Sequence, residues 1–134
     1  MSGLVLKLAP NERVLVNGAV IENGGRRSRL NILTPNANIL RLRDAIHPHE
    51  ANTPVRRVCY VLQLILSGDE EPERAKIQAQ NGIKQLQQAF TDVNSARLLS
   101  LAQENLELDR IYPALKTLRD LLPHEDLLIA DAKS

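Results

Sequence analysis

Aromatic residues are scarce in this chain, which has two tyrosines, one phenylalanine and no tryptophan among its 134 residues. Proteins that hold single-stranded nucleic acid by base stacking need several aromatic side chains on one surface. The composition therefore disfavours a stacking platform. Because hydrophobic residues still make up 43% of the chain, a core built mainly from Leu, Ile and Val is expected.

Cysteine and long apolar runs are also scarce. Cys59 is the single cysteine, so the chain forms no intrachain disulfide, which fits a reducing compartment. The N-terminal stretch "MSGLVLKLAP" lacks the charged segment and long apolar run of a secretory signal. No apolar run approaches the roughly 20 residues that cross a bilayer. These features predict a soluble, cytoplasmic protein.

Charge is distributed unevenly although the net charge is only +1. Residues 1–57 contain nine Lys/Arg and four Asp/Glu, whereas residues 58–134 contain eight and twelve. A basic first part and an acidic second part suggest different partners for the two. Two solvated surfaces of unlike composition are the alternative.

The basic part alternates apolar and polar residues between turn sequences, which is the pattern of short β-strands. Asn17-Gly18 is a strong hairpin signal, because a type I′ turn needs positive φ at both central residues. Such strands predict a small antiparallel sheet or partly closed barrel. The expected strands cover residues 4–8, 13–16, 19–22, 27–33 and 38–43.

The acidic part shows helical spacing of apolar residues after a linker at residues 44–54. Thr53-Pro54 is a helix start, and further helices are expected from about residues 69–74, 94–95 and 109. Asn81-Gly82 should weaken the second helix and introduce a kink. Short connections favour antiparallel packing. The sequence thus predicts an α+β chain: a β-module at 1–45, a helical bundle at 54–123 and a frayed tail at 124–134.

Candidate catalytic and metal-binding residues are few. His47, His49 and Cys59 lack the paired spacing of a zinc site, and His124 stands apart near the C-terminus. A cysteine beside an apolar helical stripe is usually part of the packing rather than a nucleophile. We therefore expect no enzyme activity, no metal and no cofactor.

Arginines in the β-module are the candidate binding residues: Arg26, Arg27, Arg29, Arg41 and Arg43. Alternate residues of a strand share a face, so if the strands carrying Arg27–Arg29 and Arg41–Arg43 pair, their guanidinium groups meet at one sheet edge. Guanidinium groups bind phosphate bidentately and stack on bases, which favours RNA. Solubilising arginines on an exposed face are the alternative.

Three blocks of the chain resemble the FlbT family of flagellar biosynthesis regulators, in the same order and over nearly the full length. They are "VNGAVIENGGRR", "HPHEANTPVRRVCYVLQLIL" and "YPALKTLRDLLPHE". The resemblance implies a post-transcriptional repressor that associates with the 5′ untranslated region of flagellin mRNA, promotes its degradation and works opposite a partner named FlaF. It supplies no RNA-contacting residues.

A shorter stretch, "KLAPNERVLVNG…RSRLNILTPNANILRLR" within residues 7–43, is similar in pattern to the carbon-storage regulators, which are small β-proteins that bind mRNA leaders as intertwined dimers. This likeness implies a homodimer in which Arg41 and Arg43 of one chain face residues 4–7 of the other. In the alternative interpretation, the chain is a protein-interaction module whose helical bundle binds flagellin or FlaF and affects mRNA indirectly.

Overall fold

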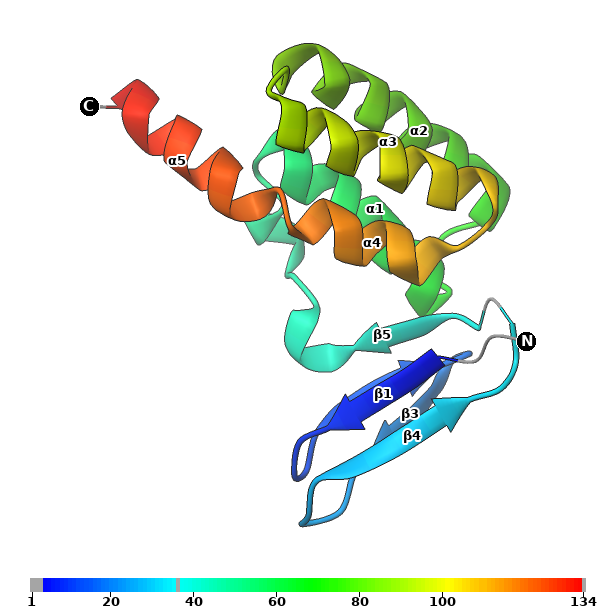
Figure 1. The fold of residues 1–134 in the computed structure, drawn as a ribbon. Coiled ribbons are helices and arrows are strands. Elements are labelled where there is room, and N and C mark those ends of the chain that lie inside the picture. Colours follow the sequence, from blue (N-terminus) through cyan, green and yellow to red (C-terminus); the bar gives the residue numbers. More distant parts are fainter. Residues whose placement is uncertain (1–3, 36, 134) are drawn as a thin grey trace.

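The computed structural model describes residues 4–35 and 37–133, and it has a β part followed by a helical part (Figure 1). This arrangement confirms the predicted α+β class, with small antiparallel sheets preceding an antiparallel helical bundle. The turn expected at residues 34–37 includes position 36, which lies outside the described residues.

The strands form two open sheets instead of a closed barrel. β1 pairs with β4, and a three-stranded sheet has the order β3-β2-β5. All pairings are antiparallel, with Leu6 opposite Leu30 and Leu15 opposite Leu40. The strands are β1 (Leu4–Leu8), β2 (Arg13–Val16), β3 (Ala19–Glu22), β4 (Ser28–Ile32) and β5 (Ile39–Arg41).

The hairpin between β2 and β3 follows from its local sequence. Asn17 has φ 48° and Gly18 has φ 86°, the positive values that a type I′ turn requires. The tight turn keeps β2 and β3 adjacent, with Val16 opposite Ala19. The prediction drawn from Asn17-Gly18 is confirmed.

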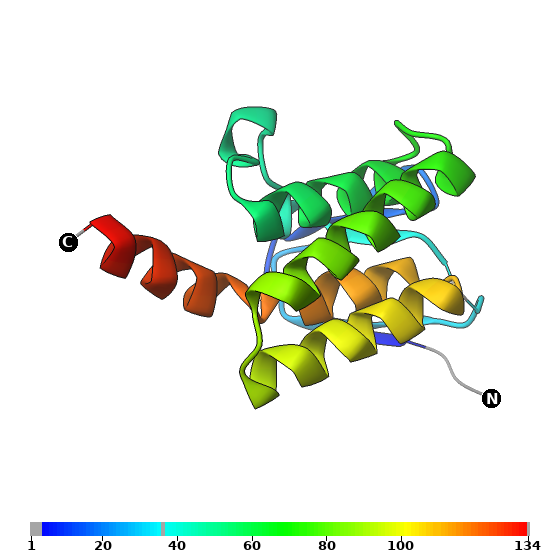
Figure 2. The same ribbon diagram turned by 90° about the horizontal axis from the view of Figure 1, so that it is seen from above.

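The helices α1 to α4 pack in sequence, and α4 returns to contact α1 (Figure 2). α1 begins as its sequence indicates, because Thr53 Oγ1 accepts a hydrogen bond from Arg56 N (3.2 Å) and Pro54 occupies the first turn. Gly68, with φ 82°, ends it. The helices are α1 (Pro54–Ser67), α2 (Pro72–Ala89), α3 (Val93–Glu107), α4 (Ile111–Arg119) and α5 (Leu122–Lys133).

Two expectations for the helical part are wrong. α2 runs without interruption through Asn81-Gly82, because Gly82 lies against Val58 of α1 and tertiary packing outweighs its low helix propensity. Most of the expected frayed tail is the helix α5. Its first turn is held by Glu125, which accepts hydrogen bonds from the Thr53 hydroxyl and from Val55 N (2.9 Å).

The segment between the two parts is bound to the helices. It contains two short 3₁₀ helices, η1 (Leu42–Asp44) and η2 (Pro48–Glu50). The Gln63 side-chain amide makes two hydrogen bonds with the Ile46 backbone, at 2.9 and 3.0 Å. Arg119 of α4 donates to the Asp44 carbonyl (3.0 Å) and forms an ion pair with its carboxylate (3.5 Å). The position of the β part relative to α4 is therefore fixed by specific contacts.

Candidate nucleic-acid interface

A row of cations lies on the outer face of the β1–β4 ribbon. Lys7 is directly opposite Arg29 in the antiparallel register, and both residues are exposed. Like charges opposite each other in a sheet destabilise it. No side-chain hydrogen bond or ion pair joins Lys7, Arg27 or Arg29 to any of residues 4–35 and 37–133. These cations are therefore available to bind an anion.

Residues from three parts of the β-module line one hollow on the surface. The end of β1, the start of β4 and η1 contribute its walls, and all the ionisable residues that line it are cationic. We call it the cationic hollow. Its lining residues are Lys7, Leu8, Ala9, Arg27, Ser28, Arg29 and Arg43.

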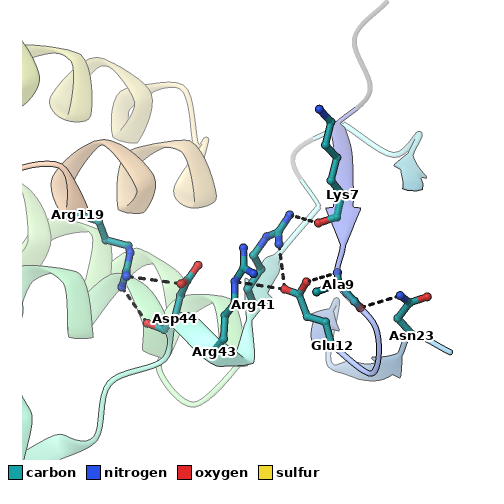
Figure 3. Close-up of polar contacts among 8 residues, drawn as sticks. All are labelled: Lys7, Ala9, Glu12, Asn23, Arg41, Arg43, Asp44 and Arg119. Carbon is teal, nitrogen blue, oxygen red and sulfur yellow. Dashed lines mark hydrogen bonds and ion pairs between the residues drawn. The ribbon is translucent and has the colours of Figure 1, made fainter. Parts of the chain in front are cut away.

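Arg41 is part of the internal structure, unlike the other candidates. Its side chain is 11% exposed and its Nη1 forms an ion pair with a Glu12 carboxylate oxygen at 2.9 Å. Its Nη2 donates to the Lys7 carbonyl at 3.0 Å. With both ends of the guanidinium engaged inside the protein, Arg41 has little capacity left for a ligand. Figure 3 shows it between Glu12 and Lys7.

Glu12 is a buried carboxylate behind the cationic hollow, with its side chain 5% exposed. One oxygen accepts from Ala9 N (3.0 Å), and the other contacts Arg41 Nη1 (2.9 Å) and Arg43 Nε (3.5 Å) (Figure 3). Burial alone would raise the pKa of Glu12, but the Ala9 hydrogen bond and the two guanidinium charges hold that pKa below its ordinary value. Glu12 is therefore an anion at neutral pH.

Asn23 organises the loop that leads into β4. Its Nδ2 donates to the carbonyl of Ala9 (2.8 Å) and to that of Arg26 (2.9 Å). Its Oδ1 accepts from the Ser28 hydroxyl (2.6 Å). The loop is thus tied to the turn after β1. Arg26 is exposed in this loop but does not line the cationic hollow.

The expected pairing between the strands of Arg27–Arg29 and Arg41–Arg43 is wrong. β4 pairs with β1, and β5 pairs with β2. Strand alternation does not apply to Arg27, which precedes β4, or to Arg43, which lies in η1. The structure nevertheless brings Arg27, Arg29 and Arg43 to one hollow, through β1 and η1.

The contact implied by the likeness to carbon-storage regulators is made within one chain. Arg41 bonds to the Lys7 carbonyl of its own β1, and Glu12 links it to the turn after that strand. Neither contact requires a second chain. The homodimer itself stays a prediction.

Cys59 lies in the buried core of the helical part, whereas His47 and His49 lie in the segment that precedes α1. Cys59 is 3% exposed, and burial raises the pKa of its thiol to about 12 although Arg119 acts in the opposite direction. His47 caps η2 and stacks on His49, with ring centroids 5.6 Å apart. In the part of the chain that the structure describes, no three His, Cys, Asp or Glu residues are arranged to hold a metal ion.

Sequence reasoning missed Lys7, Glu12 and Asn23. Lys7 carries a sequence signal, since alternation places it on the face opposite Leu6 and Leu8. The roles of Glu12 and Asn23 depend on contacts with residues that are distant in sequence, Arg41 and Ala9 respectively. No local pattern predicts such contacts.

None of the described helices is long and apolar enough to cross a membrane. Residues 4–129 match the family described as "Flagellar protein FlbT". No solved structure matches the chain.

Several bacteria have relatives of this chain that carry the same family name. The chain is 30% identical over 129 residues to the "Probable flagellum biosynthesis repressor protein FlbT" of Caulobacter sp. (strain K31), covering 92% of this chain and 93% of that protein. It is 33% identical over 127 residues to the "Probable flagellum biosynthesis repressor protein FlbT 1" of Bradyrhizobium diazoefficiens, covering 93% and 84%. A relative of the same description in Allorhizobium ampelinum is 30% identical over 128 residues, covering 96% and 85%. The chain therefore belongs to the FlbT family of flagellar proteins.

Proposed function

We propose that this protein regulates flagellum biosynthesis after transcription: it associates with the 5′ untranslated region of flagellin mRNA through the cationic hollow and promotes degradation of that mRNA. Family membership and the names of the relatives support a regulator of flagellum biosynthesis. Support for RNA as the ligand comes from the chemistry of the hollow.

One observation carries the RNA proposal. Lys7 and Arg29 lie opposite each other, and Arg27 joins them at the same hollow without a carboxylate partner among the described residues. A phosphate between such cations would remove their repulsion and accept charge-assisted hydrogen bonds. Guanidinium groups match phosphate geometry bidentately. Successive phosphates of a single strand are ligands of this kind.

The scarcity of aromatic residues adds a prediction about the binding energy. None of the residues that line the cationic hollow is aromatic, so base stacking contributes little there. Phosphate contacts should dominate, and the affinity should fall steeply as salt is added, because bound cations on the RNA are released on binding.

Titration of the purified full chain against labelled flagellin leader RNA at two salt concentrations tests the proposal. Arg27→Ala with Arg29→Ala should weaken binding by more than about a hundredfold, since hydrogen bonds to charged groups contribute ~1.5–3 kcal/mol each. The log–log salt slope should fall by about 1.4, at ~0.7 per lost phosphate contact. Flagellin mRNA should also persist longer in cells that carry this variant.

Arg97→Ala is the matched control, because Arg97 is exposed on α3, far from the hollow in sequence, and bonds only to Asn94 among the described residues. This variant should bind as the unaltered chain does. If the Arg27/Arg29 variant also binds normally at an unchanged salt slope, the cationic hollow is not the RNA site. A scrambled RNA of equal length reports whether the hollow reads sequence or only backbone.

The alternative, a helical module that binds flagellin or FlaF, draws support from α5. This helix extends away from the bundle (Figure 2) and exposes Leu127 (63%) and Leu128 (44%). Exposed leucines on a projecting helix suit a protein partner. Under this alternative, Leu127→Ser with Leu128→Ser would abolish regulation.

A further inference from the structure

A carboxylate beneath a cationic surface is unexpected if that surface only attracts phosphate. Glu12 contacts Arg43 directly, at 3.5 Å, and so lowers the positive potential at the cationic hollow. A Gln at this position would fill the same space without opposing an anionic ligand. The negative charge of Glu12 must therefore have a role other than the attraction of an anionic ligand.

The contacts of Glu12 reach two walls of the hollow. Its first oxygen fixes the turn after β1 through Ala9 N (3.0 Å), and Ala9 lines the hollow. Its second oxygen lies between Arg41 (2.9 Å) and Arg43 (3.5 Å). Arg41 in turn bonds to the Lys7 carbonyl of β1 (3.0 Å). The buried carboxylate thus joins β1, β5 and η1 at one point.

Arg43 is the lining residue whose guanidinium this carboxylate restrains. Its side chain is 58% exposed, so most of it faces solvent while Nε lies beside Glu12. A guanidinium held at Nε keeps its two terminal nitrogens free to bind a phosphate. Asp44, the next residue, forms an ion pair with Arg119 (3.5 Å), which secures η1 from its other side.

We propose that Glu12 is a positioning residue of the cationic hollow: its buried carboxylate orders Arg43 and the turn after β1 before any RNA arrives. This inference rests on the proposed RNA-binding function. Preorganisation reduces the ordering cost of binding. The ion pair with Arg41 makes that arginine part of the support and leaves phosphate contact to Arg27, Arg29, Arg43 and Lys7.

Glu12→Gln separates positioning from simple electrostatics, because the two predict opposite signs. The substitution removes one negative charge beside the hollow, so electrostatics alone predicts tighter RNA binding and an unchanged or steeper salt slope. Positioning predicts weaker binding, by about tenfold, because one charged hydrogen-bonding group is no longer preorganised. It also predicts a salt slope about 0.7 shallower, from the loss of one phosphate contact.

Glu22→Gln is the matched control. Glu22 lies in the same β-module, is exposed, pairs with Arg13 at 2.8 Å and does not line the hollow, so its substitution removes the same negative charge without touching the contacts of Glu12. Its RNA affinity should stay within about twofold of the unaltered chain or increase slightly. In a double-mutant cycle, Glu12→Gln should have a smaller effect in the Arg43→Ala background, since the contact between these two residues is then already lost.

The outcomes distinguish this inference from the function on which it rests. If the unaltered chain binds no leader RNA, the proposed function and the role of Glu12 both fall. If the unaltered chain binds and Glu12→Gln binds as tightly or more tightly, only the positioning role is overturned. Weaker binding with a shallower slope supports it.

A measurement on the unaltered chain covers the case in which Glu12→Gln does not fold. The Nε–H groups of Arg43 and Arg29 can be compared by ¹⁵N relaxation in the absence of RNA. Arg43 should be distinctly more ordered, because Arg29 has no side-chain partner among the described residues. Equal mobility of the two groups would overturn the proposal.

Discussion

The environment of Cys59 decides its chemistry. Only the thiolate is a good nucleophile, and a thiol whose pKa is about 12 is almost wholly protonated at neutral pH. We predict that Cys59 reacts with a disulfide reagent at pH 8 only after the chain is unfolded. Cys59→Ser should keep RNA binding within about twofold and cost roughly 1–2 kcal/mol of stability, because a hydroxyl replaces a buried thiol. Rapid labelling of the Cys59 thiol in the folded chain would favour a catalytic role for this residue. A Cys59→Ser variant that folds but has lost its regulatory activity would favour it too.

Gly82 is required by packing rather than by its backbone conformation. A Cβ atom placed on it would lie 2.6 Å from Val58 Cγ2 of α1. Val58 is 6% exposed and β-branched, so its side chain has few other rotamers to adopt. Gly82→Ala should therefore lower the free energy of unfolding by about 1–3 kcal/mol, measured in urea, although alanine gains about 1 kcal/mol of helix propensity.

A second substitution isolates the steric cause. Val58→Ala removes the atom that collides with the new methyl group, so the Gly82→Ala/Val58→Ala pair should lose less stability than the sum of the two single variants. The expected coupling is on the order of 1 kcal/mol. Simple additivity would show that the contact between α1 and α2 adjusts freely.

At the scale of elements, local signals predicted the helices and turns more accurately than the strand partners. Thr53-Pro54 and Asn17-Gly18 act through their own backbone and neighbours, and both were confirmed. Pairing of β4 with β1 depends on contacts between residues at least twenty positions apart, such as Leu6 and Leu30. Alternation identifies which face of a strand is apolar, but it does not identify the strand with which it pairs.

In the candidate site, too, local sequence predicted some features and tertiary contacts decided the others. Arg27, Arg29 and Arg43 were identified from residue type and position, and they do line one hollow. Arg41 looks equivalent in the sequence, but Glu12 lies beside it in the fold. An arginine that binds phosphate and one that binds an internal carboxylate have the same local pattern. Only the tertiary contact distinguishes them.

α5 depends on its first turn for attachment. Glu125 is 3% exposed and accepts hydrogen bonds from the Thr53 hydroxyl and from Val55 N, at the start of α1. We predict that Glu125→Ala lowers the free energy of unfolding by about 1–3 kcal/mol, because a buried N–H at the start of α1 loses its acceptor. Chemical denaturation followed by circular dichroism measures this loss.

Removal of residues 127–134 provides the contrast within the same helix. Leu127 is 63% exposed and Leu128 is 44% exposed, so their loss should change stability by only about 0.5 kcal/mol. A large loss on truncation would show that the distal part of α5 contributes to the fold. A small loss in Glu125→Ala would show that the start of α1 does not need this carboxylate.

At the scale of the whole molecule, the β part and the helical part share one hydrophobic core. β5 lies between the other strands and the helices (Figure 1), and its successive residues Ile39 and Leu40 are 1% and 3% exposed. Side chains of successive strand residues point to opposite faces, so β5 is covered on both. The boundary at residues 44–53 stays a prediction, but the two parts are not independent in their packing.

We predict a single cooperative unfolding transition in which NMR signals from β-module and helical residues disappear at the same urea concentration. Ile39→Ala and Leu40→Ala should each lower both midpoints together, with a loss of about 2–4 kcal/mol from the cavity that each leaves. Val20→Ala is the control, because Val20 is 61% exposed on β3 and its truncation creates no cavity. If either core variant unfolds the strands while the helices keep their original midpoint, the helical part folds without the β-module and the chain is not one cooperative unit. A shared transition means that RNA binding has to be studied in the full chain.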